Sequence, residues 1–200
     1  MTVFDLHLDR ASTASTSAVV PTTQGSRPAS DYAVVAGAWA LVVATAAVFP
    51  LDDPRVARVA LFVHLMSMAI GFGAVIVIDV YGLLWLAGRR TLAELVELDT
   101  AAHTVIAVGV GGLLASGIAL QPDLATPLAR VKMVLVLVLM LNGLGAQRFL
   151  MRLRRTVAPG TRGDSIPWAA FQRGLAAALV SQVAWWGAIA IGFITNAARH

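Results

Sequence analysis

The chain has 200 residues, of which 58% are hydrophobic and only 13% are charged, and its mean hydropathy is +0.77. Because a soluble domain carries about 25% charged residues, water cannot be the solvent for most of this surface. The sequence has no cysteine. This absence excludes disulfides, thiolate metal sites, iron–sulfur clusters and covalently attached c-type haem.

The first 51 residues divide into a polar tail and an apolar run. Residues 1–32 are rich in Ser, Thr, Ala and Pro and lack hydrophobic periodicity, which predicts a disordered tail. Residues 33–51 are long enough to span a membrane. A signal peptide cleaved near residues 44–47 is the alternative, and it would leave four helices. The long polar tail before the run, and a basic n-region that contains only Arg27, favour a spanning helix.

The rest of the chain contains four more apolar stretches, each bounded by charged or helix-breaking residues. The predicted fold class is an all-α integral membrane bundle of about five transmembrane helices, covering residues 33–197. Thr91 followed by Glu94 matches a capping box, so the third helix should begin before the membrane. Trp168, Trp185 and Trp186 are expected as interfacial anchors. The expected spans after the first are 59–87, 101–120, 128–147 and 169–195.

The pI of 10.6 reflects arginines at helix ends and in one loop, so a nucleic-acid partner is not indicated. If the spans alternate, ten of the 15 Lys and Arg residues lie on the side of the N-terminus and five on the other. The positive-inside rule then predicts an inner (plasma) membrane protein with a cytoplasmic N-terminus and an outer C-terminus.

Ionisable side chains inside spans are costly and are therefore the informative residues. They are His64, Asp79, His103 and Lys132, accompanied by the uncharged Asn142 and Gln182. At about 100° per residue, one stripe of the second span should form a face that neighbouring helices approach closely. Its members are His64, Met68, Gly71, Val75, Asp79 and Gly82.

The depth of these polar residues can be estimated from the short turns. Two antiparallel helices joined by a short turn place residues at equal distances from that turn at the same depth. An outer layer should contain His64 and Lys132, with Ser116 level with His64, whereas Asp79, His103 and Asn142 should form an inner layer. His103 is the expected partner of Asp79. Two plainer interpretations stay open: the stripe is a packing seam, and Lys132 extends to the outer headgroups. Gly109, Gly112 and Ser116 have the spacing of a helix-packing motif.

Three segments between His64 and Arg148 resemble a known group of proteins. They are HLMSMAIGFGAVIVIDVYGLLWL, GGLLASGIAL and ARVKMVLVLVLMLNGLGAQR. This pattern is similar to an uncharacterised family of small bacterial polytopic membrane proteins. That family is distantly similar to the copper-resistance D family and to the small membrane haem-b protoporphyrinogen oxidases. The resemblance implies that His64 and Lys132 matter for haem binding and function.

Three functions are compatible with these residues. The leading hypothesis is a haem-b or redox protein in which His64 or His103 ligates iron, since cysteine ligation is impossible. The estimated depths separate the two histidines by roughly 18 Å, which disfavours bis-His ligation of one haem. The second hypothesis is transport of a proton, metal or small solute through Asp79, His103 and Asn142. The third is an accessory subunit in contact with the lipid bilayer and with other subunits or further copies of itself.

Overall fold

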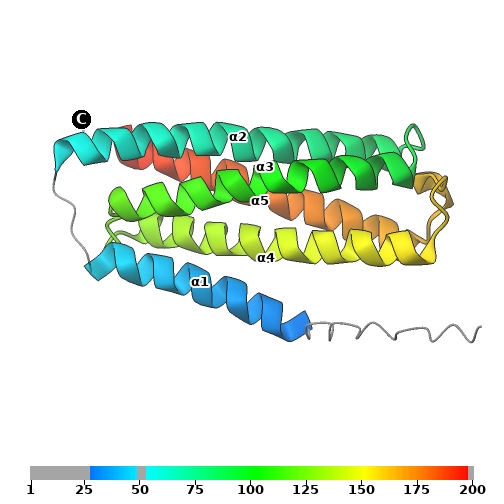
Figure 1. Cartoon of the computed structure of the whole chain (residues 1–200), viewed down its shortest axis with the longest axis horizontal. Coiled ribbons are helices and arrows are strands. Elements are labelled where there is room, and N and C mark those ends of the chain that lie inside the picture. Colours follow the sequence, from blue (N-terminus) through cyan, green and yellow to red (C-terminus); the bar gives the residue numbers. More distant parts are fainter. Residues whose placement is uncertain (1–27, 49–52, 198–200) are drawn as a thin grey trace, which may run out of the picture.

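The computed structural model describes residues 28–48 and 53–197, which form five long α-helices and one short 3-10 turn and contain no β-strand. The prediction of an all-α helical bundle is confirmed. The predicted tail over residues 1–27 and the end of the first predicted span, 49–51, lie outside the described residues. The elements are α1 Pro28–Val48, α2 Pro54–Leu86, α3 Leu92–Ala119, α4 Pro127–Thr156, η1 Gly163–Ser165 and α5 Trp168–Ala197 (Figure 1).

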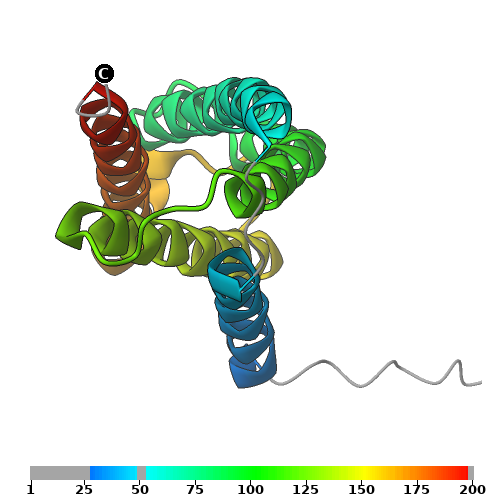
Figure 2. The same cartoon turned by 90° about the vertical axis from the view of Figure 1, so that its left-hand side faces the viewer.

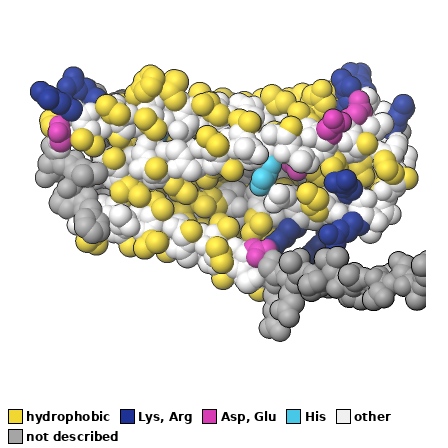
Figure 3. Space-filling view, viewed as in Figure 1, with side chains coloured by type: hydrophobic (Ala, Val, Ile, Leu, Met, Phe, Trp, Pro, Cys, Tyr) yellow, Lys and Arg dark blue, Asp and Glu magenta, His cyan; other side chains and the backbone are white. Residues whose placement is uncertain are grey.

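All five helices are long and apolar enough to cross a membrane. Their outward faces carry large exposed hydrophobic side chains, including Phe193 at 76% exposure and Val183 at 68%. Figure 3 shows the same pattern: hydrophobic side chains cover the middle of the bundle, and Lys and Arg gather at its two ends. A surface of this kind suits hydrocarbon, so the chain is built as a polytopic membrane protein.

Short polar side chains cap the starts of three helices. The Asp53 carboxylate accepts a 2.8 Å hydrogen bond from the amide of Arg55, and the Thr126 hydroxyl accepts one from the amide of Ala129 at α4. At α3, Thr91 and Glu94 form the predicted capping box, which confirms that this helix begins at Leu92, well before its apolar stretch. These contacts satisfy amides that have no partner within their own helix.

Three helices extend well beyond the expected ranges, and one of them, α2, begins at Pro54 rather than near residue 59. α1 begins at Pro28, within the segment predicted to be a disordered tail. α4 continues past Gln147, the expected end of its span, to Thr156, so the first part of the arginine-rich stretch between the last two expected spans is helical. No Pro or Gly interrupts residues 148–156, and Leu153 is buried at 7% exposure in a hydrophobic cluster. Tertiary packing therefore stabilises additional helical turns of α4 beyond the length needed to cross the hydrocarbon core.

The bundle is made of two antiparallel hairpins and one flanking helix. α2 packs extensively on α3, and α4 packs extensively on α5, whereas the two hairpins touch each other at far fewer points. In the end view of Figure 2, α2, α3, α4 and α5 surround a common axis and α1 lies outside them. α1 contacts α3 and α4. Its start is held by an ion pair between Asp31 and Arg148, whose guanidinium also lies 4.5 Å from the Tyr32 ring centre.

The end of the bundle that carries the α2–α3 turn has its own hydrophobic core. Trp85, Leu92 and Leu153 are buried there together with Leu95 and Val96. The connection between α4 and α5 folds over this core. Its carbonyl oxygens at Pro159 and Thr161 accept hydrogen bonds of 3.0 and 2.9 Å from the amides that open α3, and the Trp85 indole also donates to Thr161. We call this region the basic end, because exposed arginines surround it.

Candidate ligand pocket

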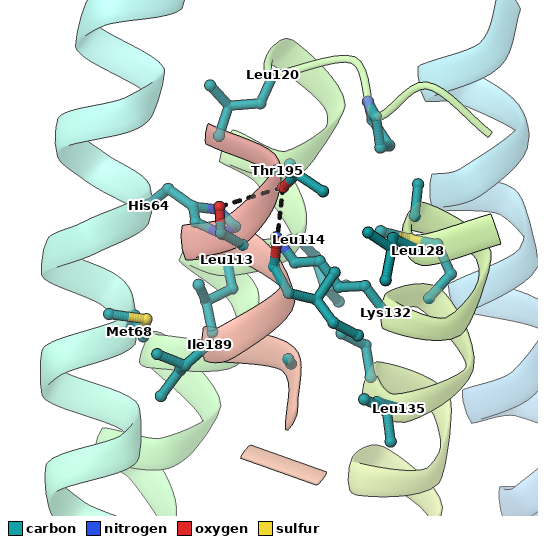
Figure 4. Close-up of a pocket in the computed structure, with 18 of the residues that line it drawn as sticks. His64, Met68, Leu113, Leu114, Leu120, Leu128, Lys132, Leu135, Ile189 and Thr195 are labelled. Carbon is teal, nitrogen blue, oxygen red and sulfur yellow. Dashed lines mark hydrogen bonds between the residues drawn. The ribbon is translucent and has the colours of Figure 1, made fainter. Parts of the chain in front are cut away.

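A pocket of about 720 Å³ lies between the two hairpins at the opposite end of the bundle from the basic end. All five helices contribute to its lining, and α1 covers it on the side of α3 and α4. Its walls are almost entirely apolar (Figure 4). The polar side chains that line it, apart from the two indoles, are His64, Asp123, Thr126, Lys132 and Thr195.

The close packing of α2 on α3 positions the histidine of this pocket. A Cβ on Gly109 would lie 2.5 Å from the Cα of Gly71, and a Cβ on Gly112 would overlap the Ser67 side chain. Glycines at these positions allow the two backbones to approach. The predicted packing face of α2 is confirmed at Gly71 and the predicted motif of α3 at Gly109 and Gly112.

The His64 ring is held by the buried hydroxyl of Ser116. Its Nδ1 lies 2.9 Å from the Ser116 Oγ, and Ser116 is only 5% exposed. Ser116 uses its single hydroxyl hydrogen in a 2.6 Å bond to the carbonyl oxygen of Gly112. The Oγ must therefore accept from His64, so Nδ1 carries the ring proton and Nε2 has a free lone pair. The expectation that Ser116 lies level with His64 is confirmed.

Two features leave the His64 Nε2 available to a ligand. Nε2 makes no hydrogen bond to a side chain within the part of the chain that the structure describes, and the His64 side chain, which also bonds the Leu113 backbone, lines the pocket. Histidines that ligate metals commonly donate their other N–H to a neighbouring acceptor, as His64 does to Ser116. The residue that sequence analysis missed in this role is Ser116, which it treated only as a packing residue.

Lys132 on α4 lies on the other side of the same pocket from His64 (Figure 4). Its Nζ lies close to α5: a Cβ atom added to Gly192 would be 3.5 Å from it. Lys132 makes no ion pair or hydrogen bond with any residue in the ranges 28–48 and 53–197. A cationic group among apolar walls is costly without an anion, and the acidic residue that lines this pocket, Asp123, forms no ion pair with Lys132.

Trp185 forms the floor of the pocket. It is 4% exposed, its ring centre lies 5.2 Å from that of Phe72, and it reaches toward Gly71. The expectation that Trp185 is an interfacial anchor is wrong, because the side chain fills the space between the two hairpins. Trp168, at the start of α5, is 67% exposed.

Asp79 lies in a separate polar pair between α2 and α5. Its carboxylate accepts a 2.7 Å hydrogen bond from the Gln182 side-chain amide, and the Gln182 carbonyl accepts a 3.1 Å bond from the Trp186 indole. The expected pairing of Asp79 with His103 on α3 is wrong. Pairing residues across the short turns estimates height along the bundle, but it does not reveal that Asp79 meets α5, although Gly71 on the same face of α2 packs on α3.

The remaining members of the expected inner layer are also apart. His103 is exposed, lies outside the pocket, and has its Nε2 3.3 Å from the amide nitrogen of Gln147. Asn142 donates a 2.9 Å bond to the backbone carbonyl of Ala177. Asp79, His103 and Asn142 therefore have three different partners and make no hydrogen bonds to one another among the described residues.

Metal chelation by protein side chains alone has no support in this geometry. Within residues 28–48 and 53–197, no three His, Asp or Glu side chains come together as a metal site. A haem supplies its own four equatorial nitrogens, so one imidazole is enough to bind it.

Comparison of the chain with known protein families, with curated proteins and with solved structures found no match. The fold and the pocket therefore define only a class, a polytopic α-helical membrane protein with an apolar internal pocket.

Proposed function

We propose that the protein binds haem b in this pocket and uses it in a redox or electron-transfer role. The observation that carries the proposal is the His64–Ser116 hydrogen bond, which leaves the Nε2 lone pair of His64 at an apolar pocket. A neutral imidazole nitrogen is a common axial ligand of haem iron.

The residues of the pocket fit haem chemistry in three respects. A volume of about 720 Å³ is in the range of pockets that hold drug-sized ligands and cofactors. The apolar walls match the porphyrin faces. Lys132 supplies a positive charge for a propionate carboxylate. When bound, haem b would supply a one-electron couple, and His64, Ser116 and Lys132 would hold and orient it.

The proposal assigns iron ligation to His64 alone of the two histidines named from the sequence. His103 belongs to α3 outside the pocket and is paired with Gln147. It therefore provides a matched control, since it is also a histidine of a membrane helix with a single side-chain partner.

The two other hypotheses have weaker support. A proton, metal or solute path through Asp79, His103 and Asn142 would need these groups to be linked, and each is bonded elsewhere. An accessory role would explain the polar pairs as links between helices. It does not explain why Lys132 lines a largely apolar pocket without an ion pair to Asp123 or to any other described residue.

For the setting of this activity, we propose an inner (plasma) membrane with the basic end facing the cytoplasm. The support is the ten-to-five division of Lys and Arg, since the α2–α3 turn, the last part of α4, the α4–α5 connection and the start of α5 place eight of the 14 arginines at one end. The pocket would then open toward the outer side.

The visible absorption spectrum of detergent-purified protein, expressed with added haem precursor, tests the proposal. The wild-type protein should show a Soret band, His64→Ala should lose it, and His103→Ala should retain it. Ser116→Ala should bind haem more weakly, because the ring loses its fixed orientation. A colourless wild-type protein, or a band that survives His64→Ala unchanged, would overturn the proposal.

A further inference from the structure

The last part of α4 presents arginines on a rigid helical surface. The helix has 30 residues and is therefore about 45 Å long, whereas the hydrocarbon core of a bilayer is about 30 Å thick. At about 100° per residue, Arg148, Arg152 and Arg155 fall within about 60° of one another. Leu153 faces away from this stripe and is buried in the hydrophobic cluster of the basic end.

Two arginines of this stripe have no acidic partner. The ion pairs among the described residues are Arg90 with Glu94 and Arg148 with Asp31. Arg152 and Arg155 are exposed and take part in neither. Positive charges near the C-terminal end of α4 interact favourably with the helix dipole. That interaction does not require two guanidinium groups on one face of the helix.

Contacts between α4 and α5 estimate the depth of these arginines. Phe149 lies next to Gly174, and Asn142 is bonded to Ala177. Because the helices are antiparallel, Arg152 and Arg155 are level with the first turn of α5. That turn carries the exposed Trp168, whose ring is stacked on Phe171 with centres 5.0 Å apart.

An aromatic pair of this kind is typical of the headgroup region of a bilayer. We therefore expect the two arginines, which are level with this pair, at the depth of lipid phosphates.

We propose that Arg152 and Arg155 bind the headgroup phosphate of an anionic diacyl phospholipid of the phosphatidylglycerol type. Guanidinium groups bind phosphate oxygens through paired, charge-assisted hydrogen bonds. The site commits to a lipid rather than to a soluble phosphate, because the arginines stand at headgroup depth on a membrane-spanning helix. It is separate from the pocket, so it holds whether or not haem binds there.

Native mass spectrometry of the full chain in detergent, titrated with phosphatidylglycerol or phosphatidylcholine, tests this site. The wild-type protein should retain phosphatidylglycerol preferentially. In the double variant Arg152→Gln/Arg155→Gln, its affinity should fall about tenfold or more. The variant Arg152→Lys/Arg155→Lys keeps both charges and should fall between these results, because a lysine cannot form the paired bonds.

The matched control is Arg55→Gln/Arg58→Gln, which removes two exposed arginines from the start of α2 at the other end of the bundle. It should leave phosphatidylglycerol binding unchanged. An equal loss in this control, or wild-type affinity in the double lysine variant, would indicate diffuse charge attraction and overturn the site. Competition by glycerol phosphate at equal concentration would overturn the assignment to a lipid. Circular dichroism checks that each variant is folded.

Discussion

The two ends of the bundle are built in opposite ways. At the basic end, Trp85 and Leu92 are 3% and 1% exposed, and the α4–α5 connection covers them and supplies hydrogen-bond acceptors to the start of α3. At the other end, the hairpins separate around a pocket of about 720 Å³ that contains His64 and Lys132. The basic end is therefore a closed hydrophobic core, whereas the other end encloses a pocket whose lining includes two polar side chains that can contact a ligand.

This comparison predicts a large difference between substitutions at the two ends. Trp85→Ala should lower the free energy of unfolding by about 3–5 kcal/mol, because it opens a cavity in the basic-end core and removes the bond to Thr161. Leu114→Ala in the pocket wall should cost about 1 kcal/mol or less, because its side chain already borders empty space.

Thermal or denaturant unfolding in detergent measures both variants. Equal losses would mean that the pocket end is packed as tightly as the basic end.

The α2–α3 seam predicts an effect of intermediate size. Gly109→Ala places a methyl group against the Gly71 backbone, so it should cost about 1–3 kcal/mol and disturb the His64–Ser116 contact on the same seam.

The control is Gly111→Ala on the same helix, where an added Cβ meets nothing within 4 Å. That variant should be neutral or slightly stabilising, because Ala favours a helix over Gly. A Gly109→Ala protein as stable as Gly111→Ala would contradict the close approach of the two helices.

The Asp79–Gln182 pair predicts the smallest effect. In a double-mutant cycle, Asp79→Ala and Gln182→Ala should show a coupling of about 0.5–1.7 kcal/mol, the range found for hydrogen bonds between membrane helices. The cycle of Asp79→Ala with His103→Ala should be additive within about 0.5 kcal/mol. If the coupling appears instead in the His103 cycle, the assignment of Asp79 to α5 is wrong.

The sequence predicted much of the fold and part of the site. Five apolar runs, the Thr91 capping box and the Gly109–Gly112–Ser116 spacing are local signals, and the structure bears them out. His64 and Ser116 were placed at one level because their helices are joined by a short turn. These successes concern features within a helix or between sequential neighbours.

The errors concern contacts between helices that are distant in sequence. Gln182 was recognised as an unusual polar residue, but nothing in the sequence shows that α5 lies beside α2 at Asp79. Trp185 has the sequence position of an interfacial anchor, and its burial depends on the gap between the hairpins, which the sequence does not show. The extension of α4 to Thr156 depends on the cluster around Leu153, which residues from four segments build.

The most direct test of the pocket's role is chemical rescue of its histidine. His64→Gly removes the imidazole while Ser116 and the apolar walls remain. This variant, purified after expression with haem precursor, should lack the Soret band of the wild-type protein. Millimolar imidazole should restore the band when haem is added. A Soret band in His64→Gly without imidazole would contradict the assignment of His64 as the iron ligand.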